Sequence, residues 1–280
     1  MPTNKQRREA AQRHLQKQLE RRAELAKKRR RNLGIIATVV AVAVVVVAAL
    51  VITGVFSGNS SSSDAAGSKS SAPASGAAAT TNADGTISCT YSPDKSGNSN
   101  LKDVGTPPKP EATVAQGTSA LLMSTDQGDL TLTLDHAKAP CAAASFTYLA
   151  SQKFFDGSPC HRLVKQDNFG VLQCGDPSGS GSGGPSYKYA EELPTGTAYP
   201  RGTIAMANTG NPGSTGSQFF LCFTDTDIPA KYTPVGIVDE AGLAVLDKIA
   251  KAGNDGSFEP SPGGGKPKIP VQISSITVAS

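Results

Sequence analysis

Four side chains that can form strong hydrogen bonds stand in two stretches of the sequence. Arg162 and Gln173 lie in the first, which reads CHRLV and then VLQCGD, and Asn208 and Gln218 lie in the second, GTIAMANTGNPGSTGSQFFLC. A guanidinium keeps its charge at any working pH and presents a planar fork of donors. The two stretches therefore supply one fixed positive charge and three side-chain amide groups.

The same stretches contain fragments of other motifs, and their contexts exclude the chemistry of those motifs. Residues 212–216, PGSTG, half-match the nucleophile elbow of hydrolases, but that motif needs a helix after it, and here a strand is expected. The glycine-rich run at 179–184 lacks the Lys-Ser/Thr pair of a phosphate-binding loop. None of the five cysteines has metal-site spacing. The sequence therefore predicts no metal and no cofactor.

Taken together, the two stretches resemble the signatures of the cyclophilin family. CHRLV followed by VLQCGD is similar to the family's F-H-R-I and M-x-Q-G-G-D. The second stretch is similar to its G-x-L-S-M-A-N, a Gly/Asn loop and G-S-Q-F-F-I. The resemblance covers residues 119 to about 278 and implies a peptidyl-prolyl cis-trans isomerase, an enzyme that accelerates rotation about X-Pro bonds.

Rotation about an X-Pro bond is slow because partial double-bond character gives the amide a barrier of about 18–20 kcal/mol. The transition state is a twisted amide whose nitrogen has regained a lone pair, so a donor aimed at that nitrogen lowers the barrier without covalent chemistry. The resemblance assigns this donor to Arg162, with Gln173 as the second catalytic residue that orients it. It assigns binding of the peptide and its proline ring to Phe169, Val171, Ala207, Asn208, Gln218, Phe220, Ile228 and Tyr232.

The apolar wall departs from the family pattern. Val171 stands where the family has a Met, and Gly170 stands where it has a Phe, with Phe169 one residue away. A one-residue bulge would return Phe169 to the proline slot. On the rim, Ile228 and, after a one-residue deletion, Tyr232 replace a Trp and a His of the family. An alternative function thus stays open: a tethered module that binds proline-containing peptides with little turnover.

Residues next to the site are expected to have structural roles. Phe219 should point away from Phe220 and into the core, since successive strand residues face opposite sides. His161, beside Arg162, should be a buried imidazole that also faces away, because the reaction moves no proton.

The five cysteines suggest two disulfides, which would require an oxidising compartment. Cys160 and Cys174 are the first candidate pair, since their family counterparts lie on neighbouring strands. Cys89 with Cys141 is the second. Cys222 is expected to be a free buried thiol.

Short strands must position these residues. Apolar side chains alternate on either side of a turn at 126–129, which predicts a hairpin that begins near residue 119. Helical spacing predicts helices from Pro140 to Gln152 and from Ala241 to Lys251. Further strands are expected at 161–165, 169–174, 203–206, 218–223, 234–238 and 271–278, the last with a bulge at 274–275. The predicted fold is mainly β: a closed eight-stranded antiparallel β-barrel, cyclophilin-like, with two capping helices and a preceding transmembrane helix.

The N-terminal part has a different composition. The first 32 residues hold 12 of the 27 Lys and Arg but three of the 23 acidic residues, so the rest of the chain has 15 basic and 20 acidic residues. An acidic body argues against nucleic-acid binding. Residues 33–52 then carry no charge for 20 residues, enough to span about 30 Å of hydrocarbon. A cleaved signal peptide would have a shorter apolar region and a small-x-small site after it.

These features predict five parts: a basic cytoplasmic tail (1–32), a transmembrane helix (33–53), a flexible Ser/Ala/Gly tether (54–88), a Pro-rich extended segment (89–117) and the isomerase domain (118–280). The arginines at 29–31 place the N-terminus in the cytoplasm. We expect a single-pass, monomeric protein of the cell membrane whose domain lies outside the cytoplasm.

Its expected partners are proline-containing peptides and secreted or envelope proteins. The composition is typical of a high-GC, actinobacterial-like bacterium. A further alternative places a function in the basic tail, which would contact cytoplasmic partners.

Overall fold

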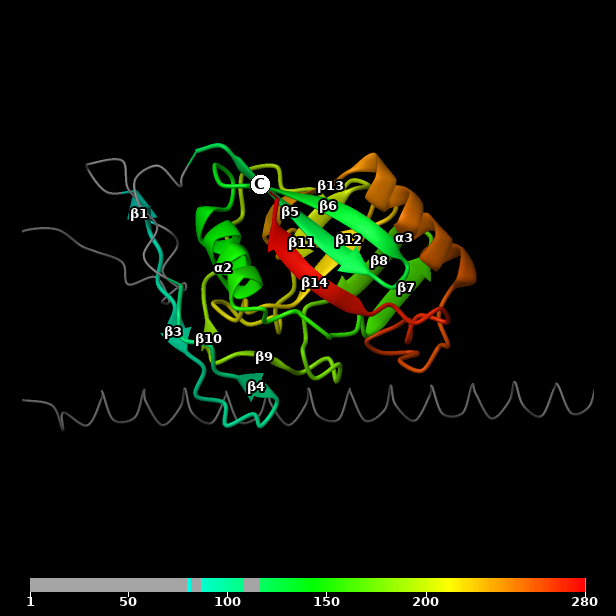
Figure 1. Cartoon of the computed structure of the whole chain (residues 1–280), viewed down its shortest axis with the longest axis horizontal. Helices are drawn as coiled ribbons and strands as arrows, with labels where there is room; N and C mark the ends of the chain where they lie inside the picture. Colours follow the sequence, from blue (N-terminus) through cyan, green and yellow to red (C-terminus); the bar gives the residue numbers. More distant parts are fainter. Residues whose placement is uncertain (1–79, 82–86, 108–115, 280) are drawn as a thin grey trace, which may run out of the picture. The chain divides into compact units, whose positions relative to one another are not determined.

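The computed structural model describes residues 80–81, 87–107 and 116–279. Its main strands are β5 (Thr118–Thr125), β6 (Gly128–Asp135), β7 (Arg162–Gln166), β8 (Phe169–Cys174), β11 (Thr203–Met206), β12 (Phe219–Cys222), β13 (Pro234–Val238) and β14 (Ile273–Val278). They form one antiparallel sheet in the order β14-β5-β6-β13-β11-β12-β8-β7, which curls around the core (Figure 1). The strands expected from the sequence are thus confirmed, with small shifts at their ends.

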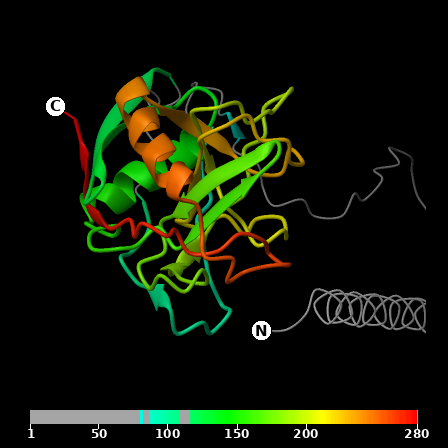
Figure 2. The ribbon, with the colours of Figure 1, turned by 90° about the vertical axis from the view of Figure 1, so that its right-hand side faces the viewer.

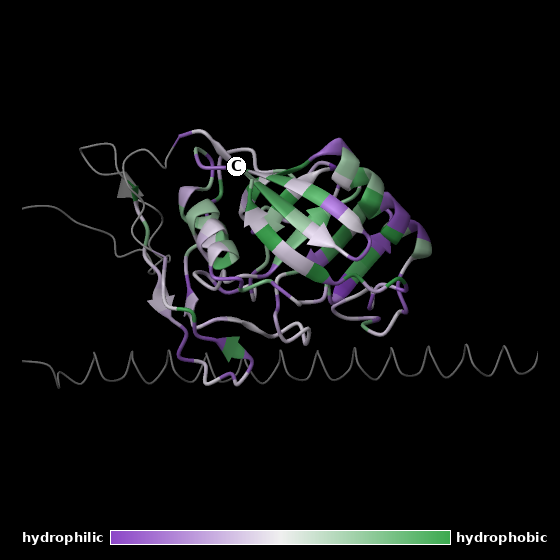
Figure 3. Cartoon of the chain, viewed as in Figure 1, coloured by the Kyte–Doolittle hydropathy of each residue, from purple (hydrophilic) through white to green (hydrophobic). Residues whose placement is uncertain are grey.

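The hairpin of β5 and β6 shows how alternation in the sequence specifies the sheet. Thr125 pairs with Gly128 across a two-residue turn. Leu121 and Met123 on β5 are fully buried, whereas Leu122 between them is 37% exposed. Figure 3 shows this alternation as apolar and polar bands along the strands. Because side chains of a strand alternate between faces, one face of the hairpin is buried in the core.

Two helices pack against the sheet, as predicted. They are α2 (Pro140–Ser151) and α3 (Glu240–Ala252), and Figure 2 shows α3 in orange beside the curled sheet. Asp239 caps α3, since its carboxylate accepts a hydrogen bond from the Gly242 amide at 2.9 Å. The same oxygen accepts from the Thr131 amide on β6 at 3.1 Å, which ties the start of α3 to the sheet.

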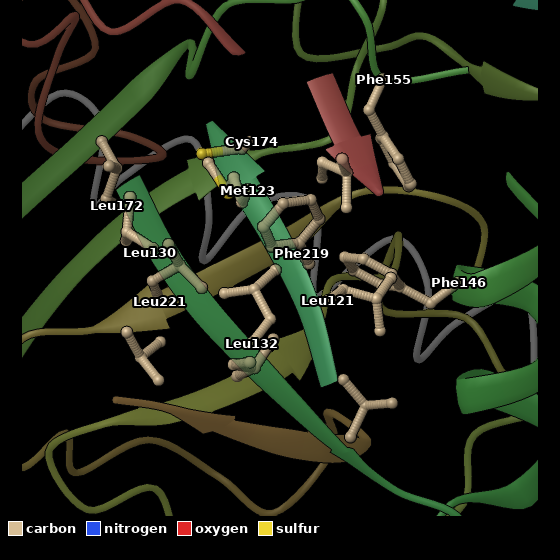
Figure 4. Close-up of a cluster of buried hydrophobic side chains, with 14 of the residues drawn as sticks. Leu121, Met123, Leu130, Leu132, Phe146, Phe155, Leu172, Cys174, Phe219 and Leu221 are labelled. Atoms are coloured by element: carbon tan, nitrogen blue, oxygen red, sulfur yellow. The ribbon is translucent and has the colours of Figure 1, made fainter. Parts of the chain in front are cut away.

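The interior is filled by aliphatic residues of the strands and by aromatic rings in tilted and edge-to-face contact (Figure 4). The ring centroids of Phe146 on α2 and Phe219 on β12 lie 5.0 Å apart, and Phe155 lies 5.0 Å from Phe146. Phe219 is fully buried, so the prediction that it points into the core is confirmed. This packing fixes β12, and with it the neighbouring Phe220 on the opposite face.

The expected closure of the barrel is wrong. β7 and β14 are the two edges of the sheet and do not pair with each other. The segment that connects α3 to β14 lies along β7 instead, with isolated bridges from Leu163 to Gly265 and from Pro159 to Gln272. This segment is rich in Gly and Pro, residues that disfavour a regular strand, so it covers the edge without closing the sheet. The bulge predicted in the last strand is present, between Ile273 and Ser275.

Residues 87–105, here called the N-terminal arm, lie against the sheet domain. Within the arm, β3 (Ser92–Pro93) pairs with β10 (Tyr187–Lys188), and β4 (Leu101–Lys102) pairs in parallel with β9 (Gly184–Pro185). A further short pair joins β1 (Thr80–Thr81) to β2 (Ile87–Ser88). The arm is therefore held against the sheet domain by these strand pairs.

Both expected disulfides are present, Cys89–Cys141 and Cys160–Cys174, and Cys222 is free and buried. The first disulfide joins the arm to α2. The predicted transmembrane helix at 33–53 lies outside the described residues, as do the basic tail and most of the tether. Among the described residues, no helix has the length and apolarity that a membrane span requires.

Candidate active site

Arg162 and Gln173 are brought together by strand register. They are directly opposite each other on β7 and β8. The Arg162 Nη1 donates a hydrogen bond to Gln173 Oε1 at 3.1 Å. Arg162 is half-buried, and this burial lowers the pKa of its guanidinium, while Tyr232 and Glu259 act to raise it. An arginine stays protonated under such a shift, so the site holds a fixed, partly desolvated positive charge.

A chain of amides orients this pair. Gln173 Nε2 donates to Gln218 Oε1 at 2.9 Å, and Gln218 Nε2 donates to the main-chain oxygens of Gly181 and Gly183, each at 3.0 Å. The loop at 176–184 is in turn organised by the buried Asp176 carboxylate, which accepts hydrogen bonds from the amides of Ser178, Gly181 and Gly183. Gln218 therefore acts as a link between Gln173 and the loop, a role that the sequence did not reveal.

The far side of the guanidinium is held by main-chain carbonyls that the sequence analysis missed. Arg162 Nε donates to the Gly263 oxygen at 2.9 Å, and Nη2 donates to the Pro262 oxygen at 2.7 Å. Gly264 lets this segment approach β7, since it has a φ of 76° and a Cβ there would lie 2.2 Å from the Leu163 oxygen. The signal in the sequence was the run of three glycines after two prolines at 260–265.

An apolar slot opens beside Arg162. It belongs to a cavity of about 590 Å³. Of the ten residues assigned to the site, nine line this cavity: Arg162, Phe169, Val171, Gln173, Ala207, Asn208, Phe220, Ile228 and Tyr232. The tenth, Gln218, lies behind Gln173 and lines a neighbouring cavity.

The wall of the slot is aromatic. The rings of Phe220 and Tyr232 meet edge to face with centroids 5.4 Å apart, and Tyr199 packs against both at 6.2 Å. The Tyr199 hydroxyl donates to the main-chain carbonyl of Tyr232 and accepts from the main-chain amide of the same residue, each at 2.9 Å. Tyr199 thus fixes the rim residue Tyr232 from behind, and sequence analysis did not single it out.

Phe169 reaches the cavity without the bulge that the sequence analysis required. β8 pairs without a break in register on both sides. Phe169, Val171 and Gln173 are two residues apart and so share one face of the strand. At Gly170 a Cβ would lie 2.3 Å from the Thr224 side chain and 2.6 Å from the Phe223 ring, so no larger residue fits there. The aromatic ring is supplied from the neighbouring position instead.

Asn208 and Ala207 border the cavity on the loop that follows β11. The Asn208 side chain donates to the Lys231 oxygen at 2.7 Å and accepts from the Gly210 amide at 2.9 Å. Its amide group is therefore used to tie this loop to the rim at residues 228–232. One N–H of Nδ2 and one lone pair of Oδ1 are left over for an extended peptide.

His161 is buried, as predicted, and the residue lies at the border of the cavity. Burial lowers the pKa of its imidazole, and Arg162 adds to this effect while Asp176 opposes it. The ring is therefore neutral near pH 7. Neither ring nitrogen has a hydrogen-bond partner within the described residues.

The arrangement suits non-covalent chemistry. A fixed cation stands at the edge of an apolar slot, and amides orient it. No group of three or more His, Cys, Asp or Glu side chains with metal-site geometry occurs in the part of the chain that the structure describes. The site can bind a small apolar ring and place a positively charged donor beside it.

Comparison with known proteins agrees with this geometry. The model of the family described as cyclophilin type peptidyl-prolyl cis-trans isomerase/CLD matches residues 120–278. A protein named "Probable peptidyl-prolyl cis-trans isomerase B" from Mycobacterium leprae is 46% identical over 90% of this chain and 92% of its own length. Its namesake from Mycobacterium tuberculosis is 41% identical over 68% of this chain and 63% of its own length.

Solved structures show the same fold. A cyclophilin-type peptidyl-prolyl cis-trans isomerase from Cryptosporidium parvum covers 59% of this chain and 99% of its own, with a TM-score of 0.51 and 26% identity. A second structure from the same organism was determined in the presence of the dipeptide Ala-Pro, and it matches with a TM-score of 0.50 and 25% identity over 57% of this chain. With a family match over most of the sheet domain and a relative similar over nearly the whole chain, this protein belongs to the cyclophilin-type peptidyl-prolyl cis-trans isomerase family.

Proposed function

We propose that this chain isomerises X-Pro bonds by placing the Arg162 guanidinium beside the amide nitrogen of a proline whose ring fills the apolar slot. The observation that carries the proposal is the way Arg162 is held. Three hydrogen bonds, to Gln173, Pro262 and Gly263, fix its plane at the mouth of the slot. Relatives named as peptidyl-prolyl cis-trans isomerases support the activity.

The hydrogen bonds of Arg162 leave donors free for the substrate. A guanidinium has five N–H groups, and the three bonds use one on each nitrogen. One N–H on each terminal nitrogen remains. A donor that meets the nitrogen lone pair of the twisted amide stabilises the transition state more than the planar ground state, which is the condition for rate acceleration. The slot contributes by holding the proline ring.

Replacement of Arg162 by lysine tests this role. Lysine keeps the charge but loses the planar fork, so we expect kcat/KM in a protease-coupled assay of a proline-containing peptide to fall about 100-fold, in the range seen when one transition-state donor is removed. The matched control is Arg201→Lys, since Arg201 makes a two-pronged ion pair with Asp247 and does not line the active-site cavity. Equal activity of Arg162→Lys and the control would contradict the role of Arg162.

The alternative, a binding module with little turnover, is favoured by one observation: Phe169 reaches the cavity from a shifted position and is only partly buried there. It predicts that a proline-containing peptide binds at micromolar concentration while the rate of isomerisation stays at the uncatalysed value. Peptide binding by fluorescence anisotropy, measured alongside the coupled assay, separates the two functions.

We further propose that the isomerase domain is tethered outside the cell membrane by residues 33–53, with secreted or envelope proteins as substrates. The uncharged run and the arginines before it support this placement. The two disulfides support it as well, since disulfides persist in oxidising compartments. The Mycobacterium relatives agree with an actinobacterial-like form.

Membrane fractionation with protease added to intact spheroplasts tests the placement. We expect the chain in the membrane fraction and the isomerase domain digested from outside. Recovery in the soluble fraction, or protection of the domain until the spheroplasts are lysed, would contradict it.

A further inference from the structure

A turn at residues 258–264, here called the carbonyl turn, carries several groups of the active site. It lies between α3 and β14, next to β7 (Figure 1). Its Pro262 and Gly263 oxygens accept the hydrogen bonds from Arg162 Nη2 and Nε, at 2.7 and 2.9 Å. Phe258, at the start of the turn, lines the active-site cavity. The position of this turn therefore sets the plane of the guanidinium.

The residue types of the carbonyl turn do not fix its main chain by themselves. Gly263 and Gly264 have φ values of 93° and 76°, and glycine loses more conformational freedom on folding than any other residue. The Phe258 amide donates to the Gly264 oxygen and the Gly263 amide donates to the Phe258 oxygen, each at 3.0 Å. These two bonds join the ends of the turn, but neither uses the amide of Gly264, which is a buried residue.

Glu259 provides the acceptor for this amide. Its Oε1 accepts a hydrogen bond from the Gly264 amide at 2.7 Å. Hydrogen bonds to an ionised carboxylate are shorter and stronger than those between neutral groups. If Glu259 were truncated, a buried amide would lose this partner, which costs more than the bond itself contributes. The carboxylate therefore fixes the glycine next to the one whose carbonyl holds Arg162.

Glu259 acts on the site from outside the cavity. Its side chain is exposed, and the residue does not line the cavity that holds Arg162 and Phe220. Its negative charge acts to raise the pKa of Arg162, so it is felt at the guanidinium. That charge opposes the positive charge that Arg162 offers to a substrate. A benefit of Glu259 for the reaction must therefore come from its hydrogen bond and not from its charge.

We propose that Glu259 is a positioning residue for isomerisation, which holds the carbonyl turn and, through it, the plane of the Arg162 guanidinium. The proposal rests on the proposed isomerase function and deepens it. Without the bond to the Gly264 amide, the glycines of the turn and the carbonyl of Gly263 can shift. The free donors of Arg162 then lose their alignment with the twisted amide, and a displacement of about 1 Å is enough to slow a reaction strongly.

Two variants of the full-length protein separate the hydrogen bond from the charge. Glu259→Ala removes both, and Glu259→Gln keeps an oxygen acceptor without the charge. In the protease-coupled assay we expect kcat to fall about tenfold in Glu259→Ala and to recover to within about twofold of the native value in Glu259→Gln. KM should change less than kcat, because Phe169, Phe220 and Tyr232 line the proline slot from other elements. Equal losses of kcat in the two variants, or none in either, would overturn the proposal.

The Nε–H group of Arg162 reports the same effect without turnover. In ¹⁵N-labelled protein its NMR signal is identified by its loss in Arg162→Lys. The bond to the Gly263 oxygen should slow the exchange of this proton with water. We expect the signal to shift and to exchange faster in Glu259→Ala, and to stay close to native in Glu259→Gln. An unchanged signal in Glu259→Ala would contradict the positioning role.

Asp126→Ala is the matched control. Asp126 is also exposed, and its Oδ1 accepts a hydrogen bond from the Gln272 amide at 2.9 Å, but it does not line the active-site cavity. We expect a similar loss of stability in urea unfolding, with native kcat and a native Arg162 signal. A fall in kcat as large as in Glu259→Ala would assign the effect of Glu259 to general destabilisation.

The two proposals fail in different ways. Absence of turnover in the native protein contradicts the isomerase function, and the NMR signal of Arg162 then still decides whether Glu259 holds the guanidinium. Native turnover together with an Arg162 signal that Glu259→Ala does not change contradicts the positioning role alone.

Discussion

Tyr199 is the residue through which the core controls the rim of the proline slot. Its buried hydroxyl makes two hydrogen bonds to the main chain of Tyr232, and its ring packs on Phe220. The rim residue Tyr232 is thereby held in its edge-to-face position against Phe220.

Removal of this hydroxyl should loosen the slot. In Tyr199→Phe the amide and carbonyl of Tyr232 lose their partners, which should cost about 1–2 kcal/mol of unfolding free energy. We expect KM for a proline-containing peptide to rise severalfold with a smaller change in kcat, because the slot binds the ring but does not supply the donor. Steady-state kinetics and urea unfolding measure the two effects.

Tyr148→Phe is the matched control for Tyr199→Phe. It removes a hydroxyl that donates to the Val104 carbonyl, a bond between α2 and the arm. We expect a similar loss of stability with KM unchanged. If KM rises equally in both variants, the effect of Tyr199 comes from general destabilisation and not from the rim.

For individual residues, the sequence predicted the side chains of the site better than its main-chain groups. Arg162 and Gln173 stand in long motifs, and their pairing follows from strand register. The carbonyls of Pro262 and Gly263 were missed because every residue has a main-chain carbonyl, so the sequence does not mark the ones that bind a side chain. A hundred residues of chain separate them from Arg162, and nothing local indicates that they meet.

The elements of the fold were predictable where one face of each is buried. The strands and both helices follow from alternation and helical spacing, and the bulge in β14 from a break in phase at Ser274 and Ser275. Closure of the barrel was not predictable in this way. Closure requires the two edge strands, β7 and β14, to pair with each other. Here the segment before β14 covers β7 instead.

The close approach of this segment to β7 makes Gly264 a sensitive position. Alanine at 264 would place its Cβ 2.2 Å from the Leu163 oxygen and 3.0 Å from Val164 Cγ2, so the segment must move away from β7. We expect Gly264→Ala to lower kcat at least tenfold, because the carbonyls that hold Arg162 move with it, and to destabilise the fold by more than about 1 kcal/mol.

Gly256→Ala separates this effect from backbone strain. Gly256 also has a positive φ, 69°, but a Cβ there meets nothing within 4 Å. It should show a cost of about 1 kcal/mol from strain alone and nearly native kcat. A loss of kcat in Gly256→Ala as large as in Gly264→Ala would mean that the position of the carbonyls does not matter.

For the molecule as a whole, Glu192 joins parts that are distant in sequence. Its two carboxylate oxygens accept hydrogen bonds from the amides of Cys141 and Ala142, at 3.0 and 2.8 Å, in the first turn of α2. Ala139, at the N-cap position, makes no side-chain cap, so this distant carboxylate replaces it. Through Cys141 the same turn is bonded to Cys89 of the arm.

This carboxylate should make the stability of the whole fold depend on pH. Burial raises the pKa of Glu192 to about 7 from an ordinary value of 4.5, although the two amide hydrogen bonds act to lower it. The folded state then binds more protons than the unfolded state between these values, so the free energy of unfolding falls as the pH rises from about 4.5 to about 7. The Glu192 side chain is only partly buried when judged by its solvent-accessible area. We therefore expect the free energy of unfolding to change by about 1–3 kcal/mol over this pH range.

Glu192→Gln isolates this contribution, because glutamine does not titrate. The unfolding free energy of the variant minus that of the native protein should increase from pH 5 to pH 8, as urea denaturation at each pH would measure. His136 and His161 have pKa values lowered by burial and change stability in the opposite sense below about 6.5, but they occur in both proteins and cancel in the difference. A flat difference would show that the positive end of α2 offsets the cost of burying the carboxylate.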